Sequence, residues 1–210
     1  RQNFRELRTE TKCLLDEKRA KNEIALVDFS NQKVYYGLDS LLIIIGNSFP
    51  FLEKIGRISF IYWFFQKFYS LVSYNRKQII PSKTDSLANA CVPDFNLKYR
   101  FIFLIFGIGF SAFLLSSISF KFDLQVNFIS AILLQIGLFS IQIGWIMNKG
   151  LEQIFNYLGN LNTLFLATSF LLFLFSMVNL PVFVNQILLL LTLVVLMLEY
   201  RRRINILNKK

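Results

Sequence analysis

Long uncharged stretches dominate the second half of the chain. They run over residues 101–120, 124–148 and 153–198, and Asn179-Leu180-Pro181 interrupts the third near its middle. A helix of about 20 apolar residues is long enough to cross the hydrocarbon core of a bilayer. The first two stretches therefore predict one span each, and the third predicts two that meet at a tight turn. We expect four transmembrane helices, at about residues 101–120, 126–147, 161–179 and 182–198.

The segment before these stretches carries an amphipathic pattern. Between Ile58 and Lys77, large apolar residues recur at helical spacing on one broad face, and polar residues fall on the opposite side. Such a helix either covers a small domain or lies in the membrane interface, and the pattern leaves both alternatives open. The apolar positions are Ile61, Phe64, Phe65, Phe68, Leu71 and Val72, and the polar ones are Ser59, Gln66, Ser70, Ser73 and Lys77.

Strand and turn patterns precede the amphipathic segment. Residues 24–29 and 33–36 are typical of two short strands, and residues 30–32 between them supply turn chemistry. Gly37 ends the second strand, and residues 38–45 indicate a helix. An isolated hairpin is marginally stable, so we expect that something completing this domain is missing. The predicted fold class is mainly α, with a partial α/β segment followed by a four-helix transmembrane bundle.

Composition agrees with a membrane protein. Hydrophobic residues make up 54% of the chain and charged residues 17%, below the share of about 25% in soluble domains. The net charge is +10, but residues 1–100 mix 16 Lys and Arg with 10 Asp and Glu. This mixture lacks the basic and aromatic clusters that bind nucleic acid. The expected partner is the lipid bilayer, with no nucleic acid, and the oligomeric state stays open.

Basic residues near the spans predict the orientation. Lys98 and Arg100 precede the first predicted span, and Arg201, Arg202 and Arg203 follow the last, in a basic tail of residues 199–210. Basic residues flank spans on the cytoplasmic side, and an even number of spans keeps both ends on one side. We therefore expect both termini in the cytoplasm. The residues expected at the membrane interface are Trp63, Lys67, Arg76, Lys77, Arg201, Arg202 and Arg203.

The spans contain few polar side chains and no ionisable ones, which weighs against a transporter or channel. Gln135 and Gln142 are seven residues apart and share one helix face. Hydrogen bonding between helices explains them better than a polar passage does. Four glycines are expected to permit close contact between helices: Gly107, Gly109, Gly137 and Gly144.

Groups for catalysis are equally scarce. The chain has no histidine, and it has two cysteines, Cys13 and Cys91, which are too far apart in sequence to replace a C-x-x-C motif. Each is a candidate redox thiol, although an ordinary structural role is the expected one. No cofactor and no metal site is predicted, because the carboxylates are not clustered and histidine is absent.

Three segments of the N-terminal half carry a family resemblance. They are Asn22-Glu-Ile-Ala-Leu-Val-Asp28, Val34-Tyr-Tyr-Gly-Leu-Asp-Ser-Leu41 and Tyr69-Ser-Leu-Val-Ser-Tyr-Asn-Arg-Lys77. They resemble the C-terminal half of the DCC family of predicted thiol–disulfide oxidoreductases, which have a thioredoxin-like fold. Several bacterial members are also similar to this chain in Cys91-Val-Pro-Asp-Phe-Asn-Leu-Lys-Tyr-Arg100, which leads into a hydrophobic tail. The resemblance covers about residues 1–100 and implies that the hairpin and the helices after it form the second half of a thioredoxin-like sheet.

The chain departs from this family at the motif that performs the chemistry. The family is named for Asp-x-x-Cys-x-x-Cys, and no C-x-x-C occurs in these 210 residues. Dithiol exchange needs that spacing, because one thiolate attacks and its neighbour resolves the mixed disulfide. We expect the motif to lie in a segment before Arg1, so that the parent protein exchanges dithiols and disulfides with a protein partner while this chain alone does not.

The predicted layout follows from these patterns. Residues 1–80 form a partial thioredoxin-like domain in the cytoplasm, 81–100 a juxtamembrane linker, 101–198 the four spans and 199–210 the basic tail. The resemblance implies a membrane-anchored thiol–disulfide oxidoreductase-type protein of the bacterial inner membrane. The alternative is a non-catalytic membrane accessory or scaffold subunit.

Overall fold

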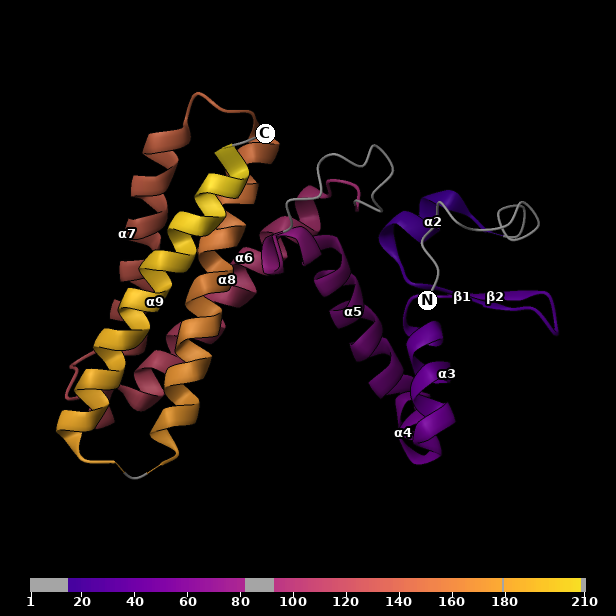
Figure 1. The fold of residues 1–210 in the computed structure, drawn as a ribbon, viewed down its shortest axis with the longest axis horizontal. Helices are drawn as coiled ribbons and strands as arrows, with labels where there is room; N and C mark the ends of the chain where they lie inside the picture. The colour runs from indigo at the N-terminus through magenta and orange to yellow at the C-terminus, as the bar shows by residue number, and fades with distance from the viewer. Residues whose placement is uncertain (1–14, 82–92, 179, 209–210) are drawn as a thin grey trace. The chain divides into compact units, whose positions relative to one another are not determined.

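The computed structural model describes residues 15–81, 93–178 and 180–208. These residues form two compact units. The first holds the described residues up to 77 together with 93–99, and the second holds residues 78–81 and those from 100 onward. In the described ranges the protein is mainly helical with one two-stranded sheet, which confirms the predicted fold class (Figure 1).

The first unit combines a β-hairpin with helices. Asp16 precedes the first of these helices and stabilises its start, since the Asp16 carboxylate accepts hydrogen bonds from the backbone N–H groups of Lys18 and Arg19. Proline at the first position of α4 suits a helix start, because its missing N–H has no partner there anyway. The helices of this unit are α2 (Glu17–Asn22), α3 (Leu38–Ser48), α4 (Pro50–Gly56) and α5 (Ser59–Ile79).

The hairpin lies where the strand pattern predicts it. Strands β1 (Ala25–Asp28) and β2 (Lys33–Tyr36) pair in antiparallel register, and Asp28 lies opposite Lys33. One carboxylate oxygen of Asp28 accepts hydrogen bonds from the backbone N–H of Ser30, at 2.9 Å, and of Asn31, at 3.3 Å. This side chain therefore stabilises the turn between the strands.

The second unit is a helical bundle. Four of its helices are long and apolar enough to cross a membrane, as expected of an integral membrane protein. A short 3₁₀ helix, η2 (Ser119–Phe122), extends the first, and the Asn127 side chain caps the second by accepting from the Ser130 N–H. The four helices are α6 (Leu97–Ile118), α7 (Phe128–Ile146), α8 (Leu151–Ser176) and α9 (Val182–Asn208).

Two helices differ in length from the prediction. Helix α8 begins at Leu151, ten residues before the predicted span at 161–179, so residues 151–160 between the second and third predicted spans are helical. Helix α9 continues to Asn208, through the predicted tail. Packing explains both differences, because Tyr157 and Leu158 in the first turns of α8, and Ile206 in the last turns of α9, are buried. Counting uncharged residues detects the uncharged part of a helix and does not predict how far the helix continues beyond it.

The bundle buries a mixture of apolar and polar side chains. Leu104, Phe139, Leu158 and Leu161 form a core cluster between α6, α7 and α8. Many large apolar residues on the outer faces are exposed, Ile141 and Leu190 among them. Apolar outer faces and buried polar contacts between helices are typical of packing in lipid.

Candidate functional site: a polar network and an apolar helix face

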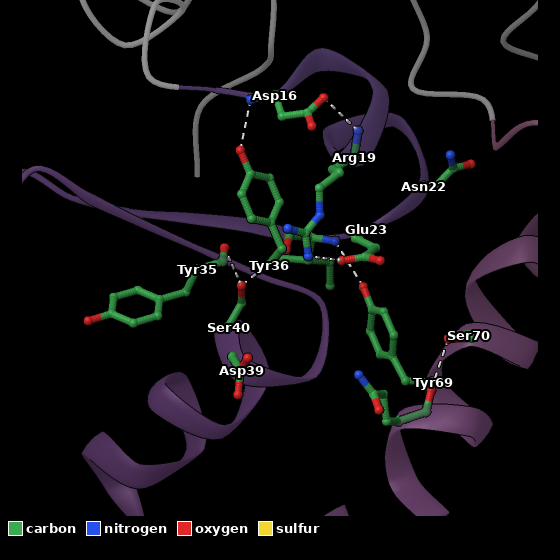
Figure 2. A network of polar contacts seen from close by, with 12 residues as sticks. Asp16, Arg19, Asn22, Glu23, Tyr35, Tyr36, Asp39, Ser40, Tyr69 and Ser70 are labelled. Carbon is green, nitrogen blue, oxygen red and sulfur yellow. Dashed lines mark hydrogen bonds and ion pairs between the residues drawn. The ribbon is translucent and has the colours of Figure 1, made fainter. Parts of the chain in front are cut away.

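A network of hydrogen bonds gathers around the hairpin of the first unit (Figure 2). The backbone N–H of Asp16 donates to the Tyr36 hydroxyl at 2.8 Å. The Arg19 guanidinium lies 4.5 Å from the centroid of the Tyr36 ring and 3.5 Å from the Glu23 carboxylate. These contacts join helix α2 to strand β2.

Ser40, from the first turn of α3, connects that helix to the sheet. Its hydroxyl lies within hydrogen-bonding distance of the carbonyl oxygen of Tyr35, at 2.7 Å, and that of Ile24, at 3.1 Å. Ser40 is fully buried, so its hydroxyl needs a partner within the protein, and these two carbonyls supply one. Gly37, just before α3, has a φ of +62°, and its backbone N–H also donates to Ile24. A side chain at position 37 would be strained in this conformation.

Helix α5 turns polar side chains toward the end of α2 and the start of the hairpin. The Tyr69 hydroxyl accepts from the backbone N–H of Ile24 at 2.8 Å. Ser73 donates to the carbonyl of Asn22, and Arg76 donates to the carbonyl of Lys21 at 2.9 Å. Positions 69, 73 and 76 are three or four residues apart and so share one face of the helix.

Tyr62 lies on the same face, two turns before Tyr69. Tyr62, Tyr69, Ser73 and Arg76 together form the polar stripe of α5. Its hydroxyl lies 3.1 Å from the carboxylate of Asp39 in α3. Burial, and then the negative charge of Asp39, raise the pKa of the Tyr62 phenol above its ordinary value. A protonated phenol is the form that donates to a carboxylate, so this contact is stable at neutral pH.

The opposite side of α5 exposes large aromatic residues. Phe60 is 75% exposed, Trp63 57%, Phe64 54% and Phe68 45%. In a water-soluble amphipathic helix the apolar face is the buried one. Here the polar stripe packs inward, and the described residues leave most of the aromatic face uncovered.

The predicted interface residues of α5 do not all share this face. Trp63 and Lys67 are exposed, and their spacing places both beside the aromatic residues. Arg76 lies on the inward stripe, bonded to Lys21, and Lys77 is half-buried. The sequence does not predict this difference, because a basic residue near a helix end is compatible both with the membrane interface and with contacts inside the protein.

The three arginines of the predicted tail differ in exposure. Arg201 and Arg202 are exposed, whereas Arg203 is 8% exposed. The Arg203 guanidinium donates to the carbonyl oxygens of Gln78, at 2.8 Å, and Ile79, at 3.1 Å. These carbonyls are at the C-terminal end of α5, where intrahelical donors run out. Arg203 therefore binds a helix end inside the second unit, unlike its two neighbours, and its place at the membrane interface stays a prediction.

Two further partners complete the surroundings of Arg203. Its Nε donates to the Glu199 carboxylate at 2.9 Å, and Nη1 donates to the Asn160 side-chain oxygen at 3.1 Å. Gln78 in turn donates through its side chain to the carbonyl of Phe155 at 2.8 Å. The sequence offers no signal for this cluster, because its members come from three segments far apart in the chain.

The two glutamines of α7 have different surroundings. Gln135 accepts from the Ser111 hydroxyl at 2.8 Å, which confirms hydrogen bonding between helices at this position. The Oε1 atom of Gln142 is buried and has no hydrogen-bond partner in the described part of the chain. Gln142 also lines a cavity of about 180 Å³ with Lys149, Tyr157 and Tyr200.

The four glycines of the predicted spans differ in the space around them. A Cβ on Gly107 would lie 2.0 Å from the Asn162 amide nitrogen, so this glycine does permit a close helix contact. At Gly109, Gly137 and Gly144 a Cβ would meet no described atom within 4 Å. The predicted close contacts at these three positions are wrong within the described chain.

The candidate redox residues, Cys13 and Cys91, lie outside the described residues. In the described ranges no three His, Cys, Asp or Glu side chains lie close enough together to hold a metal ion. No family model matches the chain, and no match was found among curated proteins or solved structures.

Proposed function

We propose that this chain is the membrane-anchored part of a thiol–disulfide oxidoreductase of the DCC type. The α/β unit would be the half of a thioredoxin-like domain that follows the catalytic dithiol. The observation that carries the proposal is the hairpin leading directly into α3, with Ser40 connecting that helix to both sides of the hairpin.

The edges of the small sheet support this proposal. In the described residues, β1 and β2 pair only with each other, so each strand has one edge without a partner strand. An unpaired strand edge is a template for a further strand. In the proposed domain, strands from outside residues 1–210 would pair there and bring the dithiol with them.

The proposed chemistry is thiol–disulfide exchange. One thiolate of the dithiol attacks a sulfur of a protein disulfide and forms a mixed disulfide, and one substrate sulfur leaves as a thiolate. The second thiol of the pair then displaces the other substrate sulfur, so the substrate gains two electrons and the dithiol becomes a disulfide. Cys13 and Cys91 are not assigned either role, because exchange of this kind needs two close sulfurs.

The proposed location is the inner membrane of a bacterium, with both chain termini in the cytoplasm. Lys98 and Arg100 at one end of the spans, and the exposed Arg201 and Arg202 at the other, support this orientation. A reporter fused after Lys210 should be active in its cytoplasmic form. Activity of an exported reporter at the same position would overturn the orientation.

The exposed aromatic face of α5 has a place in the same proposal. Phe60, Phe64 and Phe68 would enter the boundary between headgroups and acyl chains, and Lys67 would reach the headgroups. Of the two alternatives that the amphipathic pattern leaves open, the inward polar stripe of α5 favours this one.

The deciding measurement is the intact mass of the protein from its native membrane, combined with thiol alkylation. The proposal expects a mass above 24.6 kDa and at least two alkylated cysteines besides Cys13 and Cys91. Substituting either additional cysteine with serine should abolish reduction of a protein disulfide. A mass of 24.6 kDa with two thiols would instead favour a non-catalytic accessory subunit.

A further inference from the structure

A small cavity lies at one end of the helical bundle. Its volume is about 180 Å³, and its walls come from the end of α7, the loop after it, the start of α8 and the end of α9. Trp145, on its rim, is 82% exposed. Exposed tryptophan at the end of a span is typical of the membrane–water boundary, which places the cavity at the level of lipid headgroups.

One wall of the cavity carries a cation, Lys149, that forms no ion pair with a described residue. The ammonium group of Lys149 donates to the Tyr157 hydroxyl at 2.7 Å and to the Asn208 side-chain oxygen at 3.3 Å, and it lies 4.6 Å from the centroid of the Tyr157 ring. None of the ion pairs found in the described ranges involves Lys149. An ammonium group has three N–H donors, so one is left over.

The other wall carries an acceptor without a donor. Gln142 is 6% exposed, and its Oε1 has no partner among the described residues. Leaving a buried polar group unpaired is destabilising, so such a group in the lining of a cavity points to a ligand site. That ligand must supply a donor to Gln142 and a negative charge to Lys149.

We propose that this cavity binds a phosphate ester that carries free hydroxyl groups, such as the headgroup of phosphatidylglycerol. The phosphate oxygens would accept from Lys149, and a hydroxyl would donate to Gln142. A neutral hydroxyl fits better than a second ammonium group, because another positive charge close to Lys149 would be repelled. The same chemistry is present in a soluble polyol phosphate, so the two sources need to be separated by experiment.

The test is native mass spectrometry of the full chain in detergent, with phosphatidylglycerol, phosphatidylcholine and glycerol phosphate as probes. Phosphatidylglycerol should bind at least about tenfold more tightly than phosphatidylcholine, as expected for a charge-assisted contact plus one hydrogen bond. Tighter binding of phosphatidylglycerol than of glycerol phosphate assigns the cavity to lipid, and the reverse order assigns it to a soluble ester. Equal binding of phosphatidylcholine, or no binding of any probe, overturns the proposal.

Variants localise the binding. Lys149→Met and Gln142→Glu should each weaken the preferred ligand about tenfold, since the first removes the cation and the second adds a charge that repels phosphate. Lys149→Arg keeps the charge and should retain most of the affinity. Gln142→Glu also keeps the size of the side chain. It tests binding at the cavity if Lys149→Met fails to fold.

The matched control is Arg201→Met, which removes one exposed positive charge from the same end of α9. Its affinity should stay within about twofold of the parent chain, because contacts between exposed charges are weak. An equal loss in Arg201→Met and Lys149→Met would show general attraction between a basic surface and an anion, and would overturn the proposal.

Discussion

Tyr69 in helix α5 accepts a hydrogen bond from the backbone N–H of Ile24, at the entrance of the hairpin, with an oxygen–nitrogen distance of 2.8 Å. The two residues are 45 positions apart in the chain. This contact and its neighbours on the same stripe connect α5 to the start of the hairpin, to α2 and to α3, whereas the aromatic side of α5 points the other way. The polar side of α5 therefore faces the start of the hairpin, and its aromatic side faces away from it.

Replacing Tyr69 with phenylalanine should loosen this attachment. The substitution keeps the ring and removes the acceptor, so the stability of the first unit should fall by about 1 kcal/mol. Hydrogen exchange of the Ile24 amide should become about fivefold faster. Ser70→Ala is the control, because among the described residues the Ser70 hydroxyl bonds within its own helix, to the Gln66 carbonyl at 2.9 Å. Equal exchange rates in the parent chain and Tyr69→Phe would contradict the assignment.

Tyr62 predicts a loss of stability at alkaline pH. Burial and Asp39 raise the pKa of its phenol in the folded protein. The folded state therefore holds the proton more tightly, and this contribution is present below about pH 10 and is lost as the pH rises through the raised pKa. Thermal unfolding of the parent chain and Tyr62→Phe, compared from neutral pH upward, should show a smaller alkaline decrease in the variant. An equal decrease in both would rule out Tyr62 as the cause.

The aromatic face of α5 should contact lipid. In a Trp145→Phe background, Trp63 is the remaining tryptophan, and lipids brominated near the headgroup should quench its fluorescence. Phe68→Glu should weaken insertion of this face by about 1–2 kcal/mol, because the apolar area of one phenylalanine is lost, and quenching should decrease. Gln66→Glu, on the other side of the helix, adds the same charge and should leave quenching unchanged. Absence of quenching in the Trp145→Phe protein would show that α5 does not lie at the membrane interface.

Arg203 and its neighbour Arg202 form a matched pair for stability. Both contact Glu199, but Arg203 is buried on the carbonyls of Gln78 and Ile79, whereas the Arg202 side chain is 55% exposed. Arg203→Ala should cost about 3 kcal/mol, since it leaves buried partners unpaired. Arg202→Ala should cost less than about 1 kcal/mol. Unfolding in denaturing detergent measures both, and similar losses would show that burial of Arg203 contributes little.

Two glycines of α6 should respond oppositely to alanine. Gly107→Ala pushes a methyl group into the Asn162 amide, which donates to the Phe103 carbonyl at 2.9 Å, and should destabilise the bundle by about 1–3 kcal/mol. Gly109→Ala meets no described atom and should be neutral or stabilising by about 0.5–1 kcal/mol. Unfolding in detergent compares the two variants. A smaller loss in Gly107→Ala than in Gly109→Ala would contradict the close contact.

The sequence was sufficient for the elements whose signal is local. The four long apolar helices, the hairpin with its turn at residues 30–32 and the amphipathic helix before them all follow from hydrophobic length, turn residues and helical spacing. The minimum length of a span is set by bilayer thickness, and a turn depends on a few adjacent residues. These properties are encoded in consecutive positions, so they can be read without knowing what lies beside them.

The tertiary structure decided which side of each element meets protein. It placed Arg203 on the end of α5, gave Gln135 a partner and left Gln142 without one, and turned the polar stripe of α5 toward the hairpin. None of these outcomes follows from spacing, because the bonded residues are at least 24 positions apart in the chain, and the lack of a partner at Gln142 depends on the whole of its surroundings. A helix pattern shows that a polar and an apolar face exist, whereas the neighbours that satisfy buried polar groups determine which face is covered.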